Sequence, residues 1–198
     1  MTTYSFPTGI IPKRATWKLS SNTQRFTSPL DGTVQTLTLP GARWSVDYPF
    51  YLDNSNGRRL IGFLGKLSGQ GNTFTIHDFS FEEPNGVGTG TPLVAGASQT
   101  GSTLDTDGWT VSQTGILLSG DYFEVNGELK IMTEDADSDA GGNATLTFQP
   151  PLRSSPPDSD PITVSKPTAI MMLDEDSYTY SVDQNKYYSI NISCIEVF

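Results

Sequence analysis

The feature that most constrains the fold is the segment Tyr122–Met132, which reads YFEVNGELKIM. Two alternating runs flank the pair Asn126-Gly127, and Asn-Gly is the preferred two-residue turn of a β-hairpin because both positions accept a positive φ. Similar turn chemistry recurs along the chain, which holds 19 glycines and 13 prolines among many Ser, Thr, Asn and Asp residues. This punctuation suits many short strands and argues against a helical bundle, so we expect a mainly β protein.

Several other segments alternate as strands do. The runs VQTLTL (34–39) and RWSVDYPF (43–50) alternate apolar and polar residues, and turn residues separate them. A period of two places one face of each strand in a core. TFTIHDFSF (73–81) and KYYSINISCIEVF (186–198) read as further strands. We expect the last strand to complete a sheet that begins near the N-terminus.

One segment, residues 55–67, has the period of a helix. Its apolar residues share one face: Leu60, Ile61, Phe63, Leu64 and Leu67. Asp53 or a neighbouring polar residue can cap the start, and Gly69 can end the helix. Gly62 and Gly65 each cost about 1 kcal/mol relative to Ala inside a helix, so tertiary packing must hold this one.

The chain is acidic, with a formal net charge of −10 and a pI of about 4.4. Phosphate contacts require clustered Lys and Arg. The 12 basic residues are scattered apart from Lys13-Arg14 and Arg58-Arg59, which disfavours a fixed nucleic-acid-binding surface. Solubility alone accounts for this balance, and a channel that lets DNA pass without holding it would also favour it.

The sequence predicts neither a signal peptide nor a membrane span. The N-terminal run MTTYSFPTGIIPKRATW has no apolar stretch preceded by positive charge. No run of about 18 apolar residues occurs. The single cysteine, Cys194, cannot form an intramolecular disulfide and lies at an alternating strand position typical of a small core residue. We therefore expect a protein that is made in the cytoplasm and does not enter a membrane.

The most acidic stretch is TEDADSDAGGN (133–143), between two predicted strands. It is either a cage for a divalent cation or the solvated tip that joins the strands. An EF-hand loop beginning at Asp135 needs glycine at its sixth position and a bidentate glutamate at its twelfth, where Ala140 and Leu146 stand. We therefore expect a solvated tip whose charges discourage edge-to-edge association.

The residue types that catalysis needs are scarce. His77 is the only histidine, so neither an acyl-transfer triad nor a histidine-dependent zinc site is well supplied. Paired carboxylates could cut a glycosidic bond. No spacing singles out a pair among Asp105, Asp107, Glu124, Glu128, Asp174, Glu175 and Asp176. Glu124 and Glu128 lie on opposite arms of the predicted hairpin, where we expect solvated charge. No enzyme, cofactor or metal site is predicted.

Aromatic side chains could form a sugar-binding platform or fill a β core. They are Trp17, Trp44, Trp109, Tyr178, Tyr180, Tyr187 and Tyr188, and most occupy alternating positions, as in a core. Within residues 88–165, Trp109, Tyr122 and Phe123 are the candidate contacts for a carbohydrate or host-surface polymer. If these three are core residues instead, Trp109→Ala should cost roughly 3 to 5 kcal/mol of stability.

The order of these segments resembles a known family. SNTQRFTSPLDGTVQTLTLPGARWSVDYPF (21–50) leads into DNSNGRRLIGFLGKLSGQGNTFTIHDF (53–79). GTPLVAGASQTGSTLDTDGW (90–109), GDYFEVNGELKIMTEDADSDAGGNATLTFQPPLR (120–153) and YYSINISCIEVF (187–198) follow. Together they resemble the distal tail proteins of long-tailed bacteriophages and the related small tail proteins that follow the tape measure protein. The similarity covers nearly the whole chain through structural motifs, so it implies architecture and assembly.

The resemblance implies a β-sandwich or split-barrel core from residues 1–87 and 166–198, with residues 88–165 inserted as a second, small β-barrel-like domain. It further implies a structural virion protein, an adaptor at the tail tip that is assembled in the host cytoplasm. Six copies would form a ring between the tail tube protein and the hub or baseplate protein, leaving a channel for the tape measure protein and DNA.

The net charge suggests a property of that channel. An acidic wall would repel duplex phosphate and reduce friction during ejection. A bore lined by Lys13, Arg14, Arg58 and Arg59 would contradict this hypothesis. The alternative reading of the whole chain is a β module of the tail tip that binds carbohydrate or a host surface.

Overall fold

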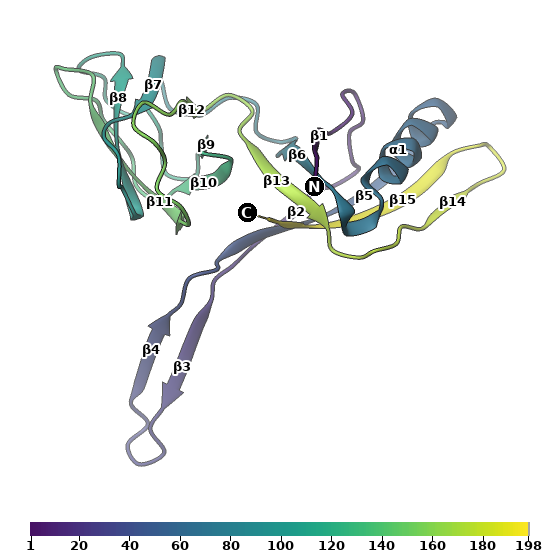
Figure 1. Ribbon diagram of the computed structural model, residues 1–198, viewed down its shortest axis with the longest axis horizontal. Coiled ribbons are helices and arrows are strands. Elements are labelled where there is room, and N and C mark those ends of the chain that lie inside the picture. Colours follow the sequence, from purple (N-terminus) through teal and green to yellow (C-terminus); the bar gives the residue numbers. More distant parts are fainter. Residues whose placement is uncertain (198) are drawn as a thin grey trace.

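The computed structural model describes residues 1–197 and shows, within them, a mainly β protein with a single α-helix, as predicted (Figure 1). The largest sheet has the strand order β1-β6-β13-β15-β5-β2, and β14 pairs with β15 beside this path. Its strands are β1 (Thr3–Ser5), β2 (Thr16–Ser20), β5 (Arg43–Leu52), β6 (Thr73–His77), β13 (Thr168–Leu173), β14 (Tyr180–Val182) and β15 (Tyr188–Glu196).

The large sheet is built from both ends of the chain. β15 pairs antiparallel with β5, from Tyr188 opposite Leu52 to Ile195 opposite Ser45, and with the end of β13 on its other side. The prediction that the last strand completes a sheet begun near the N-terminus is therefore confirmed. Alternate side chains of the two strands are buried in one core: Trp44, Val46, Tyr48, Phe50, Leu52, Ile190, Ile192 and Cys194.

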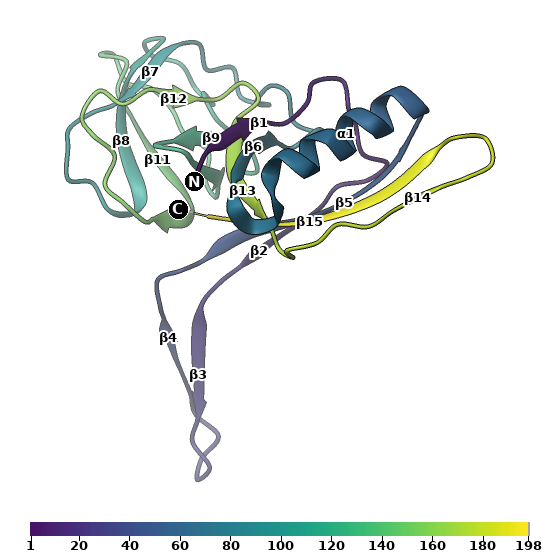
Figure 2. The same ribbon diagram turned by 45° about the vertical axis from the view of Figure 1, so that its right-hand side comes forward.

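Helix α1 (Asn54–Leu67) covers one face of this sheet (Figure 2). The Asp53 carboxylate caps its start by accepting a hydrogen bond from the Asn56 N–H at 2.9 Å. The predicted helix is confirmed, and its apolar stripe is buried, with Leu60, Leu64 and Leu67 inaccessible to solvent. A short 3₁₀ turn, η1 (Gly69–Gly71), follows. No helix among residues 1–197 is long and apolar enough to cross a membrane.

The second sheet has the order β12-β9-β10-β11-β8-β7, and a bridge between Leu93 and Pro161 joins the two ends of that order, so the sheet nearly closes into a small barrel. Its hairpin turn at Asn126-Gly127 has φ values of 51° and 75°, as predicted. The strands are β7 (Gly90–Val94), β8 (Gly101–Trp109), β9 (Tyr122–Val125), β10 (Glu128–Met132), β11 (Ala144–Leu152) and β12 (Ile162–Thr163). Its core contains Leu104, Phe123, Val125, Leu146 and Phe148.

The third sheet departs from expectation. β3 (Thr23–Thr27) and β4 (Val34–Thr38) pair only with each other and extend away from the rest of the molecule in both views (Figures 1 and 2). The prediction that the run 34–39 buries one face is wrong, because all five residues of β4 are exposed. Val34 and Leu37 lie on opposite faces of the ladder, so β4 has no continuous apolar face, and no second layer among residues 1–197 packs against the ribbon.

Candidate functional site

The candidate functional site is the projecting hairpin formed by β3, β4 and the turn between them, hereafter the arm (residues 23–38). Every residue of its two strands is exposed to solvent. The ladder between the strands is nevertheless unbroken, from Thr23 opposite Thr38 to Thr27 opposite Val34. The arm is therefore a regular ribbon that presents two faces and two free edges.

One face of the arm, hereafter its apolar face, carries two large apolar side chains, each opposite a glutamine. In the ladder Phe26 lies opposite Gln35, and Leu37 lies opposite Gln24. Residues opposite each other project from the same face, so Phe26 and Leu37 are diagonal neighbours on one face. Their side chains are 59% and 51% exposed, and Leu30 at the tip is 96% exposed. Large apolar side chains thus line a surface that nothing in residues 1–197 covers.

The tip of the arm holds its own shape. The Ser28 N–H donates to the Thr33 carbonyl oxygen at 2.8 Å, and the Gly32 N–H donates to the Ser28 carbonyl oxygen at 3.0 Å. The Asp31 carboxylate accepts hydrogen bonds from the Thr33 N–H at 3.1 Å and from the Thr33 hydroxyl at 2.8 Å. Hydrogen bonds from Ser28 and Thr33 lower the pKa of Asp31 to about 2. The turn is closed by these local bonds without support from the molecule's core.

An arm of this kind is unusual in an isolated molecule. A single two-stranded ribbon is marginally stable in water, because it buries little apolar surface. Its unpaired strand edges are also a template for pairing with another chain. Natural proteins blunt such edges with charges or prolines, yet the strands of the arm carry only Arg25 as a charged residue. The arm has the properties of a surface that another chain covers.

Four charged side chains form a cluster at the base of the arm: Glu128, Lys130, Arg153 and Glu196. Lys130 Nζ donates to Glu128 Oε2 at 2.6 Å and to the Pro151 carbonyl oxygen at 3.0 Å. Arg153 forms an ion pair with Glu196, with Nη1 donating to Oε1 at 3.0 Å. The side chains of Lys130 and Glu196 are 0% and 1% exposed. Two positive and two negative charges balance, as burial requires.

The cluster also fixes the strand that leaves the arm. Glu196 Oε2 accepts a hydrogen bond from the Trp44 N–H at 2.9 Å. Arg153 Nη2 donates to the Ala42 carbonyl oxygen at 3.1 Å. The start of β5, the C-terminal strand and the end of β11 therefore meet in one hydrogen-bonded network. This junction ties the segment that follows the arm to the large sheet and to the second sheet.

The expectation that Glu124 and Glu128 are solvated is wrong. The hairpin of β9 and β10 contacts β13 of the large sheet, so one side of it is covered. Glu128 is 4% exposed. Glu124 is half-buried and accepts a hydrogen bond from the Thr168 hydroxyl at 3.3 Å. Burial raises the pKa of Glu124. Neither carboxylate belongs to a solvated hairpin face.

The expectation of a solvated tip at residues 133–143 holds for the charged side chains but not for the loop as a whole. Its carboxylates are exposed, but the loop packs against residues 112–121, and Ala136 is buried in a bridge with Leu117. The carboxylates accept backbone hydrogen bonds, Asp135 from Ser119 at 2.8 Å, Asp137 from Gly115 at 2.7 Å and Asp139 from Gly141 at 2.7 Å. These bonds brace the loop. No group of three or more His, Cys, Asp or Glu residues suited to hold a metal ion occurs among residues 1–197.

The three candidate sugar contacts do not form a surface. Trp109 and Phe123 are 4% and 0% exposed inside the second sheet, and the Trp109 indole N–H donates to the Thr106 hydroxyl at 2.8 Å. Tyr122 is half-buried, with its ring centroid 5.9 Å from that of Trp44 and 5.2 Å from that of Phe81. Trp109 and Phe123 therefore offer no face on which a sugar could stack.

The residues considered for catalysis are dispersed as well. His77 is half-buried in β6 against Phe79, with ring centroids 5.0 Å apart, and burial lowers its pKa. Cys194 is buried in β15, and burial raises the pKa of its thiol. Each therefore favours its neutral form within a packed strand. Asp78, Glu82 and Lys166 lie near His77, but within residues 1–197 none of them forms a hydrogen bond with its imidazole.

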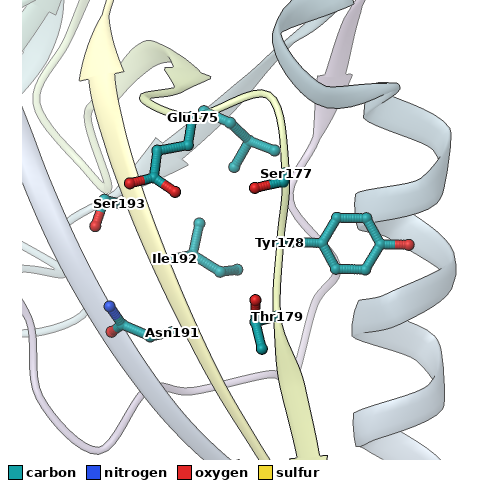
Figure 3. Close-up of a pocket in the computed structure, with 8 residues that line it drawn as sticks. Glu175, Ser177, Tyr178, Thr179, Asn191, Ile192 and Ser193 are labelled. Atoms are coloured by element: carbon teal, nitrogen blue, oxygen red, sulfur yellow. The ribbon is translucent and has the colours of Figure 1, made fainter.

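A small groove of about 220 Å³ opens beside β15, where residues 174–179 connect β13 to β14 (Figure 3). It is lined by Leu173, Glu175, Ser177, Tyr178, Thr179, Asn191, Ile192 and Ser193. Figure 3 shows the polar side chains around the opening, while the ring of Tyr178 is turned toward the helix. Glu175 is the single carboxylate of the lining, so the groove lacks the second acid or base that hydrolysis requires.

Comparisons with protein families and with curated proteins found no match. No protein-family model matches the chain, and no curated protein is significantly similar to it. The geometry of the arm and of the sheets therefore carries the functional argument.

Proposed function

We propose that this chain is a structural subunit of a bacteriophage tail tip. Six copies form a ring that joins the tail tube protein to the hub or baseplate protein and leaves a channel for the tape measure protein and DNA. The resemblance in the order of the segments supports the setting. The observation that carries the proposal is the arm, because a fully exposed ribbon with an apolar face is a surface for assembly.

The mechanism that follows is mechanical. Each copy contributes a rigid β body, and the neutral charge cluster at the base of the arm ties the segment that follows the arm to that body. A neighbouring copy that covers Phe26 and Leu37 buries apolar surface worth roughly 25 cal/mol per Å². An arm and the surface it covers are different patches of the chain, so the contact is heterologous and repeats around a closed ring.

The test is the assembly state of the purified protein and of an arm variant. We expect the wild-type chain to form closed multimers, seen by light scattering and as rings by electron microscopy. Phe26→Ser with Leu37→Ser should weaken assembly strongly while circular dichroism and thermal unfolding stay those of a folded protein, because both side chains are already exposed. Thr23→Ser with Thr36→Ser, on the opposite face of the arm, is the matched control and should assemble as the wild type does.

Two results would count against the proposal. One is a wild-type chain that stays monomeric at high concentration and forms no ring. The other is a multimer that the apolar-face variant and the control form equally well.

A further inference from the structure

We propose that copies of this chain join edge to edge, with the basic free edge at β2 of one copy against the acidic free edge at β14 of the next. This inference rests on the proposed function and names the contact through which neighbouring copies meet. The contact is separate from the apolar face of the arm and can be tested separately.

The large sheet has a free edge on each side of its central pair. Within residues 1–197, β2 pairs only with β5 and β14 pairs only with β15. β14 lies beside residues 188–190 of β15, and β2 lies beside residues 43–47 of β5, toward the other end of this strand pair. The free sides of β14 and β2 therefore face in opposite directions and are offset along the strands. All three residues of β14 are exposed, with Tyr180 and Val182 at 48% and 47%. Each copy therefore offers two different strands for pairing.

The two edges carry opposite charge. Residues 1–22, which lead into and include β2, contain no acidic residue and three basic ones: Lys13, Arg14 and Lys18. Residues 167–185 contain no basic residue and four acidic ones: Asp174, Glu175, Asp176 and Asp183. All seven are exposed. Lys18 lies in β2, and Asp174, Glu175 and Asp176 lie in the connection that leads into β14. Asp47 and Asp78 beside the basic edge and Lys186 beyond β14 reduce these charges but do not reverse them. Lys13 is partly engaged within its own copy, since its Nζ lies 4.4 Å from the ring centroid of Tyr51, whose hydroxyl donates to Asp183.

This complementarity selects a second copy as the occupant. A chain of net charge −10 repels its own copies in most orientations, and like charges brought together at an interface cost several kcal/mol. Basic β2 against acidic β14 is an orientation in which copies attract each other. Because the two edges differ, each copy uses one edge of each kind, and the contact continues from copy to copy until the ring closes.

Two side chains suit a test because they play no other role. Within residues 1–197, Lys18 and Glu175 form no side-chain hydrogen bond or ion pair. Asp183 is unsuitable, since it accepts hydrogen bonds from the Tyr187 N–H at 2.9 Å and from the Tyr51 hydroxyl at 2.8 Å. Charge reversal at Lys18 or Glu175 therefore changes the edge and leaves the fold intact.

The experiment compares assembly of full-length variants by light scattering over a range of concentrations, at low and at high salt. Lys18→Glu and Glu175→Lys should each weaken association about tenfold or more. Lys166→Glu, between β12 and β13 in an exposed ion pair with Glu82, and Glu134→Lys in the second sheet unit make the same changes in net charge outside both edges, and they should assemble as the wild type does. Raising the salt from physiological to molar concentration should weaken the wild-type contact and narrow the difference between variants and controls.

Mixing supplies the decisive result. A mixture of the Lys18→Glu and Glu175→Lys variants can alternate, so that every contact joins opposite charges, and the mixture should assemble where each variant alone does not. If the wild type forms rings but both variants assemble like their controls, the edge contact is overturned and the proposed function stands. If the wild type stays monomeric throughout, both are overturned.

Discussion

The buried charge cluster makes a sharp prediction about stability, because its two halves are not equally supported. Lys130 Nζ has two hydrogen-bond acceptors, Glu128 and the Pro151 carbonyl oxygen. Glu128 has more donors, since the backbone N–H groups of Arg153 and Ser154 also donate to it, each at 3.2 Å. We therefore expect Glu128→Gln, which leaves the lysine charge without its partner, to cost more than Lys130→Met, which leaves the carboxylate with its backbone donors.

The structure limits how much unfolding free energy each of the two variants can lose. Removing one partner of a buried ion pair typically costs about 3 to 5 kcal/mol. A buried lysine that has lost its partner can give up its proton, and at pH 7 this costs about 5 kcal/mol for an ordinary pKa of 10.5. This free energy is therefore the upper limit for the cost of leaving Lys130 unpaired. Burial already lowers the pKa of Lys130, so the actual cost of Glu128→Gln is smaller, about 3 kcal/mol. For Lys130→Met we expect about 1 to 2 kcal/mol, because the remaining carboxylate keeps several donors.

The double variant tests the coupling. Once Lys130 is methionine, Glu128→Gln no longer strands a charge, so the double variant should be about as stable as Lys130→Met alone, with a coupling energy of about 2 to 3 kcal/mol. Urea unfolding followed by tryptophan fluorescence gives each free energy of unfolding, and constant m-values show that the cooperativity has not changed. Equal costs for the two single variants, or costs that add in the double variant, would refute the reasoning.

Three further predictions use the same unfolding assay. Trp109→Ala should cost roughly 3 to 5 kcal/mol because the side chain is 4% exposed, and a cost under about 1 kcal/mol would place it on the surface. Gly62→Ala should stabilise by up to about 1 kcal/mol because nothing lies within 4 Å of the added Cβ, whereas Gly57→Ala should destabilise because its Cβ would lie 2.4 Å from the Tyr188 ring. Glu124→Gln should stabilise at neutral pH. Burial raises the folded pKa of Glu124 above its unfolded value of 4.5, so between these two pKa values the folded state binds more protons than the unfolded state. Wild-type stability therefore falls as the pH rises through this range. The stability advantage of the variant should vanish near pH 4.

Short-range sequence patterns were enough to predict several secondary-structure elements. The turn at Asn126-Gly127, the helix capped by Asp53 and the last strand all follow from interactions within a few residues, and the structure places them as expected. The burial of β4 could not be predicted in this way. Val34 and Leu37 of β4 lie on opposite faces of the ladder, and only the arrangement of the whole chain decides whether a second layer packs against either face.

The buried charges were missed for a similar reason. Glu128 and Lys130 alternate with Leu129 and Ile131, a pattern typical of a strand with one solvated face. In the structure both faces of β10 are covered, one by the interior of the second sheet and the other by the junction with the large sheet. Glu128 and Lys130 are therefore buried together and balance each other's charge as an ion pair. Asp121 is a parallel case, buried at 0% exposure with the backbone N–H groups of Asn85 and Gly86 donating to it.

The net charge and the two proposed contacts together make assembly depend on salt in both directions. At very low ionic strength the charge of −10 acts over long distances, and repulsion between whole copies opposes their approach. At physiological ionic strength the Debye length is about 8 Å, so this long-range repulsion is screened while oppositely charged side chains that touch across the edge still attract. At molar salt the edge contact weakens as well, and only the apolar face of the arm holds the copies together. Assembly should therefore be strongest at intermediate salt, and a chain that associates through the arm alone would instead assemble better as salt rises throughout.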